Sequence, residues 1–205
     1  MPSDYDYDLT TREGFMRRTD EVTRRRIPER FRDAVATDPA VITWCDQLAR
    51  AYTGGDPLAV TSLLITGPTG IGKTYQAYGA IRRIAASGVV IGWLASTVPD
   101  LYAALRPRPD TDGEAEFRRW AGVPLLLLDD LGAAKDSEWT EEILYRLVNY
   151  RSERLRPLII TSNLPRRNTP GRPSLQAVLS ERVYSRLAEY TPVTLKGRDR
   201  RLGAS

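Results

Sequence analysis

The stretch Gly67-Pro68-Thr69-Gly70-Ile71-Gly72-Lys73-Thr74 decides how this chain is interpreted. Its glycines, lysine and threonine match every fixed position of the phosphate-binding pattern G-x-x-x-x-G-K-[ST]. Glycines let the backbone curl so that consecutive N–H groups point at phosphate oxygens, and the helix that follows adds partial positive charge. We expect this loop to bind ATP, with Lys73 on the β- and γ-phosphates and Thr74 as a ligand of Mg²⁺.

The flanks of the loop support this interpretation. An apolar strand is predicted over 61–66, directly before the loop, and a helix over 74–86, directly after it. The alternative is a glycine-rich turn that binds nothing. The flanks disfavour it, because a strand before and a helix after are the context in which this motif works.

Beyond residue 57 short apolar runs alternate with helical stretches. Strands are predicted over 61–66, 89–95, 125–129, 158–162 and 193–195, and helices over 74–86, 98–105, 114–120, 137–155 and 174–190. Alternation of this kind indicates an α/β fold with a parallel sheet that is covered on both faces. We therefore predict a nucleotide-binding core over 57–205.

The residues before this core form a short extension over 1–56. Residues 1–20 are acidic and tyrosine-rich without clear periodicity, so a flexible arm is expected there. A basic cluster over 24–31 is broken by Pro28. A helix is predicted over 39–52, where apolar residues recur near helical spacing and Gly54, Gly55 and Pro57 follow.

Composition removes several kinds of chemistry. The chain of 205 residues has one cysteine, Cys45, and no histidine. An intrachain disulfide, a cysteine-based zinc site, Ser-His-Asp catalysis and histidine pH switching are therefore excluded. Phosphoryl transfer remains, because it works with lysine, arginine, carboxylates, asparagine and backbone amides.

Charge and hydropathy bear on location and partners. No apolar run approaches the roughly 18 residues that a membrane helix needs, and the first residues are acidic where a secretory signal would be basic and then apolar. We expect a cytoplasmic protein without a membrane partner. The net charge of +4 permits nucleic-acid binding, although a general preference for arginine explains it equally well.

Two predicted strands end in polar side chains. Leu125–Leu128 lead into Asp129 and Asp130, and carboxylates beside a core are costly without a role. We assign Asp129 to Mg²⁺, through water, and Asp130 to the attacking water; the alternative is that both start a loop before Gly132. Asn163 follows the strand over 158–162, where it could reach the γ-phosphate or could simply end the strand.

Two arginines lie four residues apart in the last predicted helix. Arg182 and Arg186 share one face beside the apolar stripe of that helix. An arginine presented to the γ-phosphate of a neighbouring subunit couples assembly to hydrolysis. Spacing alone favours the alternative, an ordinary solvated face.

Taken together, these motifs resemble the AAA+ ATPases of the DnaC/IstB type, which are bacterial helicase loaders and transposition helper ATPases. The resemblance runs from about Arg26 to Leu202, and its most specific stretch is 125–133 continuing through 138–151. It implies that Lys73 and Thr74 are the Walker A lysine and Mg²⁺ ligand. The other implied roles are a Walker B pair at Asp129 and Asp130, sensor 1 at Asn163, an arginine finger at Arg186 with Arg182 as its companion, and a sensor-2 arginine at Arg201.

The resemblance also implies an architecture and partners. The fold would be a three-layer α/β/α sandwich with sheet order 5-1-4-3-2 and no separate C-terminal lid domain. The protein would assemble on ATP and single-stranded DNA and act with a hexameric replicative helicase, or with a transposase in the IstB branch. A nucleotide-dependent clamp with negligible hydrolysis is a further possibility, and a small P-loop kinase fits less well.

The chain departs from this family in two respects. Its N-terminal region of about 55 residues is shorter than the helicase-binding module of full loaders, which puts helicase recognition in doubt. The second acid of the Walker B pair is Asp130 rather than the glutamate of most AAA+ proteins. The shorter side chain suggests slow hydrolysis.

The segment 96–119 is the predicted DNA face. It carries Arg106, Arg108, Arg118 and Arg119 together with the aromatic residues Tyr102, Phe117 and Trp120. Arginines interleaved with aromatic rings suit single strands, through phosphate contact and base stacking. The alternative is an ordinary pair of helices whose aromatic residues belong to the core.

Overall fold

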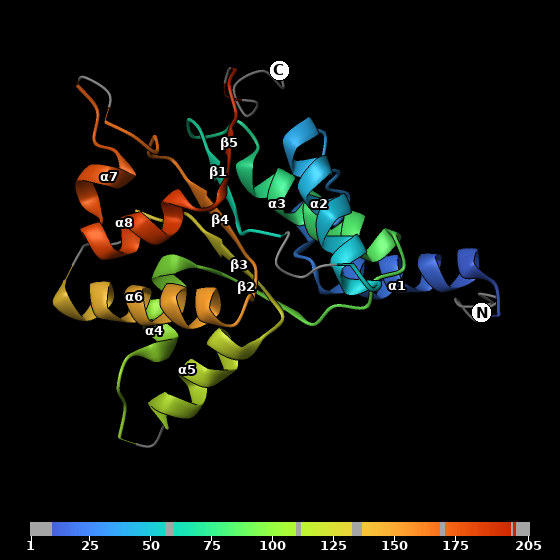
Figure 1. The fold of residues 1–205 in the computed structure, drawn as a ribbon, viewed down its shortest axis with the longest axis horizontal. Helices are drawn as coiled ribbons and strands as arrows, with labels where there is room; N and C mark the ends of the chain where they lie inside the picture. Colours follow the sequence, from blue (N-terminus) through green and yellow to red (C-terminus); the bar gives the residue numbers. More distant parts are fainter. Residues whose placement is uncertain are drawn as a thin grey trace. The chain divides into compact units, whose positions relative to one another are not determined.

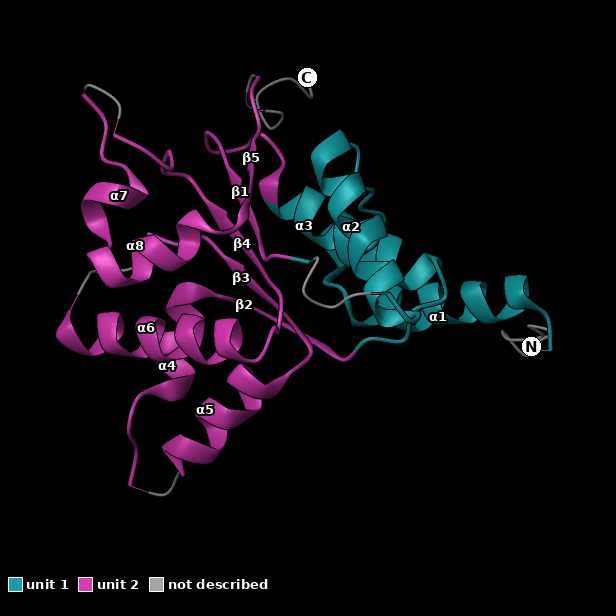
Figure 2. Cartoon of the chain, viewed as in Figure 1, with its two compact units in different colours: residues 1–60, 74–91 teal, residues 61–73, 92–205 magenta. Residues whose placement is uncertain are grey.

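The computed structural model describes residues 10–55, 60–109, 112–132, 137–168, 171–197 and 199. They fall into two compact units (Figure 2): residues 1–60 with 74–91, and residues 61–73 with 92–205. The predicted division at residue 57 stays a prediction; in the structure the helix after the phosphate loop groups with the N-terminal residues. Among the residues described, no helix combines the length and apolarity that crossing a membrane requires.

The second unit is built on a parallel sheet of five strands (Figure 1). The strands are β1 (Leu63–Thr66), β2 (Trp93–Thr97), β3 (Leu125–Asp129), β4 (Leu158–Ser162) and β5 (Thr191–Thr194). Their order is β2-β3-β4-β1-β5, and every neighbouring pair is parallel. Read from the other edge, this is the predicted order 5-1-4-3-2, so the predicted α/β fold class is confirmed.

The apolar strands are buried on both faces, as the uninterrupted leucines of β3 predict. Every second residue of the central strands joins one core with the helices of this unit. Those helices are α4 (Val98–Leu105), α5 (Gly113–Gly122), α6 (Glu138–Glu153), α7 (Leu175–Val178) and α8 (Glu181–Ala188). The strand residues of this core include Leu64, Leu126, Leu128, Leu158 and Ile160.

A buried arginine ties the amino ends of two strands together. Arg151 of α6 is 1% exposed, and its guanidinium donates to the carbonyls of Ala121, Val123, Pro124 and Pro157 at 2.6–3.1 Å. These carbonyls lie just before β3 and β4, so one side chain satisfies several buried backbone acceptors at the start of both strands.

The single helix predicted over 174–190 is wrong. The chain forms α7 and α8 instead, separated by Leu179 and Ser180, whose ψ angles of 149° and 153° are extended. Serine followed by glutamate is a helix-start signal, and the apolar stripe that suggested one long helix continues across it. Strand β2 begins at Trp93 rather than at residue 89, and β5 begins at Thr191 rather than at residue 193.

The flexible arm predicted over 1–20 is also wrong for its described part. Helix α1 spans Arg12–Arg26, with Thr11 as its N-cap. The helix lacks an apolar stripe, so hydrophobic periodicity does not reveal it. Local charge pairs stabilise it, with Glu13 on Arg17 and Glu21 on Arg25, each four residues apart.

The rest of the first unit packs around two helices. A 3₁₀ turn, η1 (Glu29–Phe31), precedes α2 (Pro39–Tyr52), which has the predicted bounds, and α3 spans Lys73–Ala86. Gln76 of α3 accepts from the backbone amides of Thr37 and Asp38 at 2.9 and 3.2 Å. This buried side chain fixes the start of α2 against the first turns of α3.

Candidate nucleotide-binding site

The phosphate loop has the backbone that its glycines predict. Gly70 and Gly72 have φ of 77° and 100°, which non-glycine residues rarely adopt. A Cβ atom at Gly67 would lie 2.6 Å from the carbonyl oxygen of Leu195, so only glycine fits there. The loop leaves β1 and runs into α3, whose first residue is Lys73.

The Lys73 ammonium lies inside the curl of this loop. Its Nζ donates to the carbonyl of Pro68 at 2.8 Å and to Oδ1 of Asn163 at 2.6 Å, and the residue is 5% exposed. Asn163 in turn donates through Nδ2 to Oδ1 of Asp130 at 3.2 Å. The structure therefore brings together three of the predicted site residues, one after each of β1, β4 and β3.

A threonine on β4 holds the acid pair in place. The Thr161 hydroxyl donates to Oδ1 of Asp129 at 2.5 Å and accepts from the Asp130 N–H at 3.0 Å. Asp130 has φ of 60°, a conformation that costs a non-glycine residue about 1–3 kcal/mol and needs support from its surroundings. The fully buried hydroxyl supplies part of that support.

Sequence reasoning gave Thr161 no role, although a signal was present. β3 and β4 pair with Leu128 opposite Ile160. The next residues along the two strands are Asp129 and Thr161, so the predicted neighbourhood of the strands was enough to put the hydroxyl beside the first carboxylate.

The predicted ligands of Mg²⁺ are Thr74 and Asp129. Thr74 directly follows Lys73 and Asp129 ends β3; each carries an oxygen of the kind that this ion prefers, and their joint part in holding it stays a prediction. Within the ranges that the structure describes, no three acidic, cysteine or histidine side chains gather as a metal cluster. That pattern is compatible with Mg²⁺, which takes one or two protein ligands and nucleotide phosphates.

The segment after β5 lies against the phosphate loop. The Leu195 amide donates to the carbonyl of Thr66 at 2.8 Å, and a Cβ atom at Gly70 would collide with the carboxylate of Asp199. Sequence reasoning gave Asp199 no role. Arg201, the expected sensor-2 residue, lies outside the described residues.

The two arginines of α8 rest on α6. Arg186 donates from Nη2 to Oδ1 of Asn149 at 3.2 Å and pairs with Glu189 at 3.6 Å. The guanidinium of Arg182 lies 5.9 Å from the ring centre of Tyr145. The predicted common face of Arg182 and Arg186 therefore packs beside α6 of the same chain.

The base-stacking interpretation of segment 96–119 is wrong, because Tyr102, Phe117 and Trp120 are buried in the core. The alternative, core aromatic residues, is the observed one. Arg118 and Arg119 pair with Glu114 and Glu116 at 3.4 and 2.9 Å.

The other two arginines of this segment are also engaged within the chain. Arg106 lies 6.0 Å from the ring centre of Trp139, and Arg108 donates to the Ala103 carbonyl at 3.1 Å. All four arginines thus have partners within the unit, while their part in DNA binding stays a prediction.

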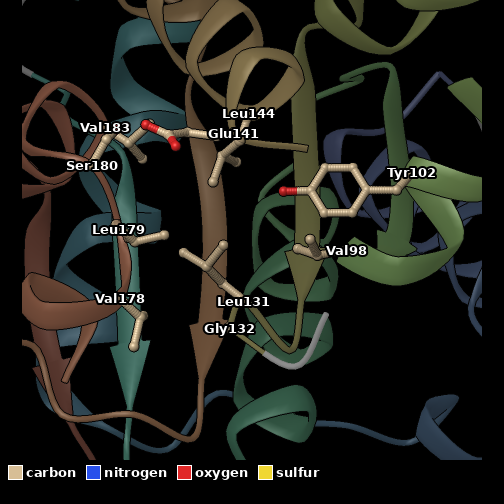
Figure 3. Close-up of a pocket in the computed structure, with 10 residues that line it drawn as sticks. All are labelled: Val98, Tyr102, Leu131, Gly132, Glu141, Leu144, Val178, Leu179, Ser180 and Val183. Atoms are coloured by element: carbon tan, nitrogen blue, oxygen red, sulfur yellow. The ribbon is translucent and has the colours of Figure 1, made fainter. Parts of the chain in front are cut away.

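A small apolar pocket follows the acid pair (Figure 3). The pocket is small, with a volume of about 40 Å³ open to the centres of water-sized molecules. Figure 3 shows the Tyr102 hydroxyl pointing from one side toward the side chains of Leu144 and Leu131. The other lining residues are Val98, Gly132, Glu141, Leu144, Val178, Leu179, Ser180 and Val183.

The sheet order and the site define a class. A parallel sheet in the order 5-1-4-3-2, with a glycine-rich loop after the first strand, an acid pair after the third and an asparagine after the fourth, is that of an AAA+ ATP-binding protein. Within this class the chain belongs to the family of IstB-like ATP binding proteins, whose sequence profile matches residues 59–190.

Curated relatives support both branches of the family. The chain is 25% identical over 144 residues to the replicative helicase loader DnaC of Escherichia coli K12, covering 68% of this chain and 55% of that protein. It is 27% identical over 138 residues to a putative ATP-binding protein in an insertion sequence of Mycobacterium tuberculosis, covering 67% and 50%. The chain thus spans about half the length of the relatives it matches.

Solved structures agree on the fold. The crystal structure of DnaI superposes with a TM-score of 0.64 at 22% identity, covering 85% of this chain and 94% of that one. The crystal structure of the DnaC helicase loader gives 0.64 at 20% identity, covering 82% and 100%. The replication initiator DnaA bound to AMPPCP and single-stranded DNA gives 0.59 at 22% identity, covering 78% and 45%.

Proposed function

We propose that this protein is a DNA-associated ATPase of the helicase-loader type. ATP binding and slow hydrolysis would be coupled to assembly on single-stranded DNA and to a hexameric replicative helicase in the cytoplasm. The observation that carries the proposal is the hydrogen-bonded chain from Lys73 through Asn163 to Asp130. It links the group that binds phosphate to the group beside the attacking water, as a nucleotide-driven switch requires.

The residues would divide the work in the following way. Gly67–Thr74 hold the triphosphate, and Thr74 with Asp129 hold Mg²⁺, which when bound neutralises developing phosphate charge. Asp130 orients the attacking water, and Asn163 positions it against the γ-phosphate. Arg186, with Arg182 beside it, would act on the nucleotide of a neighbouring subunit, and Arg201 on its own.

The proposal predicts a slow enzyme. Asp130 is one methylene shorter than glutamate, and its carboxylate already accepts from Asn163. A base that lies farther from the water and is hydrogen-bonded to a neighbour abstracts a proton less effectively.

A second candidate is a transposition helper that uses the same ATPase core with a transposase. The relative in an insertion sequence supports it as strongly as DnaC supports the first. Affinity capture from the native host separates the two, because a loader retains a helicase and a helper retains a transposase.

Steady-state ATPase measurements test the core of the proposal. The wild type should hydrolyse ATP slowly and faster with single-stranded DNA, whereas Lys73→Ala should lose nucleotide binding while remaining folded. A wild type that binds ATP tightly without turnover, with and without DNA, would instead indicate a nucleotide-dependent clamp.

A further inference from the structure

We infer that α1 presents a binding surface for single-stranded DNA, made of Arg12, Phe15, Val22 and Arg26, which we call the α1 stripe. The inference rests on the proposed DNA association and locates it on the first unit instead of segment 96–119. The stripe ends in the basic cluster near Pro28, for which the nucleotide site provides no explanation.

Spacing and exposure define the stripe. Its members follow one another at intervals of three, seven and four residues, so they lie along one face of the helix. All four are exposed, with Phe15 at 42% and Val22 at 44%. The buried residue Thr23 lies at nearly the same angle around the helix as Arg12, so the stripe borders the packed side of α1. The Phe15 ring lies beside Gly88 of the same unit, and the 42% of the side chain that stays exposed offers apolar surface between the two arginines.

Charge strengthens the case. Residues 12–32 contain eight arginines and four acids, a net charge of 8 − 4 = +4. Three of these acids pair within the unit: Glu13 with Arg17, Asp20 with Arg82 and Glu21 with Arg25. Segment 96–119 contains four arginines and five acids, a net charge of 4 − 5 = −1. A polyanion is attracted to the first segment and not to the second.

The chemistry fits a single strand better than a duplex. Arginines at the two ends of the stripe can contact phosphates that lie several nucleotides apart, while the Phe15 ring and Val22 offer apolar surface to the unpaired bases between them. In a duplex the base faces are stacked inside, so Phe15 would stay in solvent. The stripe therefore combines the two contacts by which proteins hold single strands without sequence preference.

Anisotropy titration with a labelled oligothymidylate tests the arginines. Arg12→Gln with Arg26→Gln should weaken binding and reduce the slope of log K against log salt by about 1.4, because each arginine that neutralises a phosphate of a single strand contributes about 0.7. The matched control, Arg106→Gln with Arg118→Gln, changes the net charge equally and should leave affinity and slope near wild type. An equal or larger effect of the control pair would overturn the inference.

Phe15 tests the base contact. Phe15→Ala should weaken binding about tenfold with an unchanged salt slope, whereas Phe15→Tyr should restore it because a phenol ring also stacks. Leu155→Ala removes another exposed apolar side chain, 50% exposed, and should have no effect. Poly-glutamate that competes as well as the oligonucleotide would show a general acidic-partner surface and reject base contact.

The experiments distinguish failure of the proposed DNA association from failure of the α1 stripe. If the wild type binds no single strand at low salt with ATP present, both the DNA association and the stripe are rejected. If the wild type binds and the α1 variants bind equally well, only the stripe is rejected. ATP binding measured on the same samples shows that the nucleotide site is intact.

Discussion

Lys73 and Asn163 are joined directly, with Nζ of the lysine 2.6 Å from Oδ1 of the asparagine. The other end of the asparagine amide donates to Asp130. An anion that binds the Lys73 ammonium therefore competes with Asn163 for the ammonium hydrogens. Because Asn163 is also hydrogen-bonded to Asp130, a movement of Asn163 would change that bond as well. One side chain, that of Asn163, thus contacts both the lysine proposed to bind phosphate and the acid proposed to orient the attacking water.

The Thr161 hydroxyl should control how well the acid pair handles Mg²⁺. Thr161→Val removes the donor to Asp129 and leaves the Asp130 N–H unsatisfied. We expect the Mg²⁺ concentration for half-maximal ATPase activity to rise about tenfold, the lower range for removal of a metal ligand's hydrogen-bond partner. Thr161→Ser keeps the hydroxyl and should behave as wild type. Equal defects in both variants would show that the methyl group, and packing, is what matters.

Asp130 should act on turnover and not on binding. Asp130→Asn keeps the size of the side chain but removes the carboxylate that we propose orients the water. We expect Mg·ATP affinity within about twofold of wild type and turnover lower by about 10²-fold or more, the scale for removal of a general base. Fluorescent-nucleotide titration and phosphate release measure the two. Undiminished turnover would move the role to Asn163.

Asp199 should oppose nucleotide binding. Its carboxylate lies against Gly70, in the loop that must accept a polyanion. Asp199→Asn removes the repulsion at similar volume, and we expect ATP to bind about fivefold more tightly, as about 1 kcal/mol of screened repulsion implies. Glu142→Gln changes an exposed acid of α6 by the same charge and serves as the control. Weaker binding by the Asp199 variant would instead make the carboxylate part of the site.

Arg186 should act between subunits. Arg186→Ala should bind ATP as well as wild type in an isolated subunit but lose assembly-dependent hydrolysis, where such a finger contributes roughly 10³–10⁵ in rate. Mixing it with Lys73→Ala should restore part of the activity, because mixed interfaces pair an intact loop with an intact arginine. No rescue at any ratio, with subunit exchange confirmed, would leave Arg186 as a helix-packing residue bonded to Asn149.

Cys45 should report opening of the first unit. The side chain is buried and contacts the Ala80 carbonyl of α3, and burial raises the pKa of its thiol to about 12. At pH 8 the native thiol stays protonated and should react with a thiol reagent only through opening, while Cys45→Ala should not react. Because the folded pKa is raised, this group lowers the free energy of unfolding as pH rises from about 9 towards 12. Complete labelling of native protein within the mixing time would contradict this.

Sequence alone was sufficient where one local signal dominated. The bounds of β3, β4, α2 and α4 were predicted to the residue, because apolar runs and proline or glycine breaks coincide there. Helix α1 was not predicted, because charge pairs rather than an apolar stripe stabilise it. The last helix was predicted as one because periodicity continued across the break at Ser180.

The candidate site also contains residues that local sequence motifs predicted and residues that they did not. The motifs identified Lys73, Asp130 and Asn163, which the structure connects. Thr161 and Asp199 were missed because their roles depend on partners that are distant along the chain, Asp129 and Gly70. Thr161 meets its partner because two strands pair, and Asp199 meets its partner because the segment after β5 lies against the phosphate loop. Neither arrangement leaves a pattern in the neighbouring sequence.

Arg151 gives the amino ends of β3 and β4 a different kind of hydrogen-bonded support from their carboxyl ends. At the amino ends of β3 and β4, four carbonyls converge on one side chain that keeps its charge and all its donors at any ordinary pH. At the carboxyl ends, backbone bonds such as that from the Leu131 amide to the Thr161 carbonyl are present, but the link from Lys73 through Asn163 to Asp130 runs through side chains. We therefore expect displacement during a nucleotide cycle to be larger at the carboxyl ends of the strands than at the amino ends, where the Arg151 guanidinium holds the backbone.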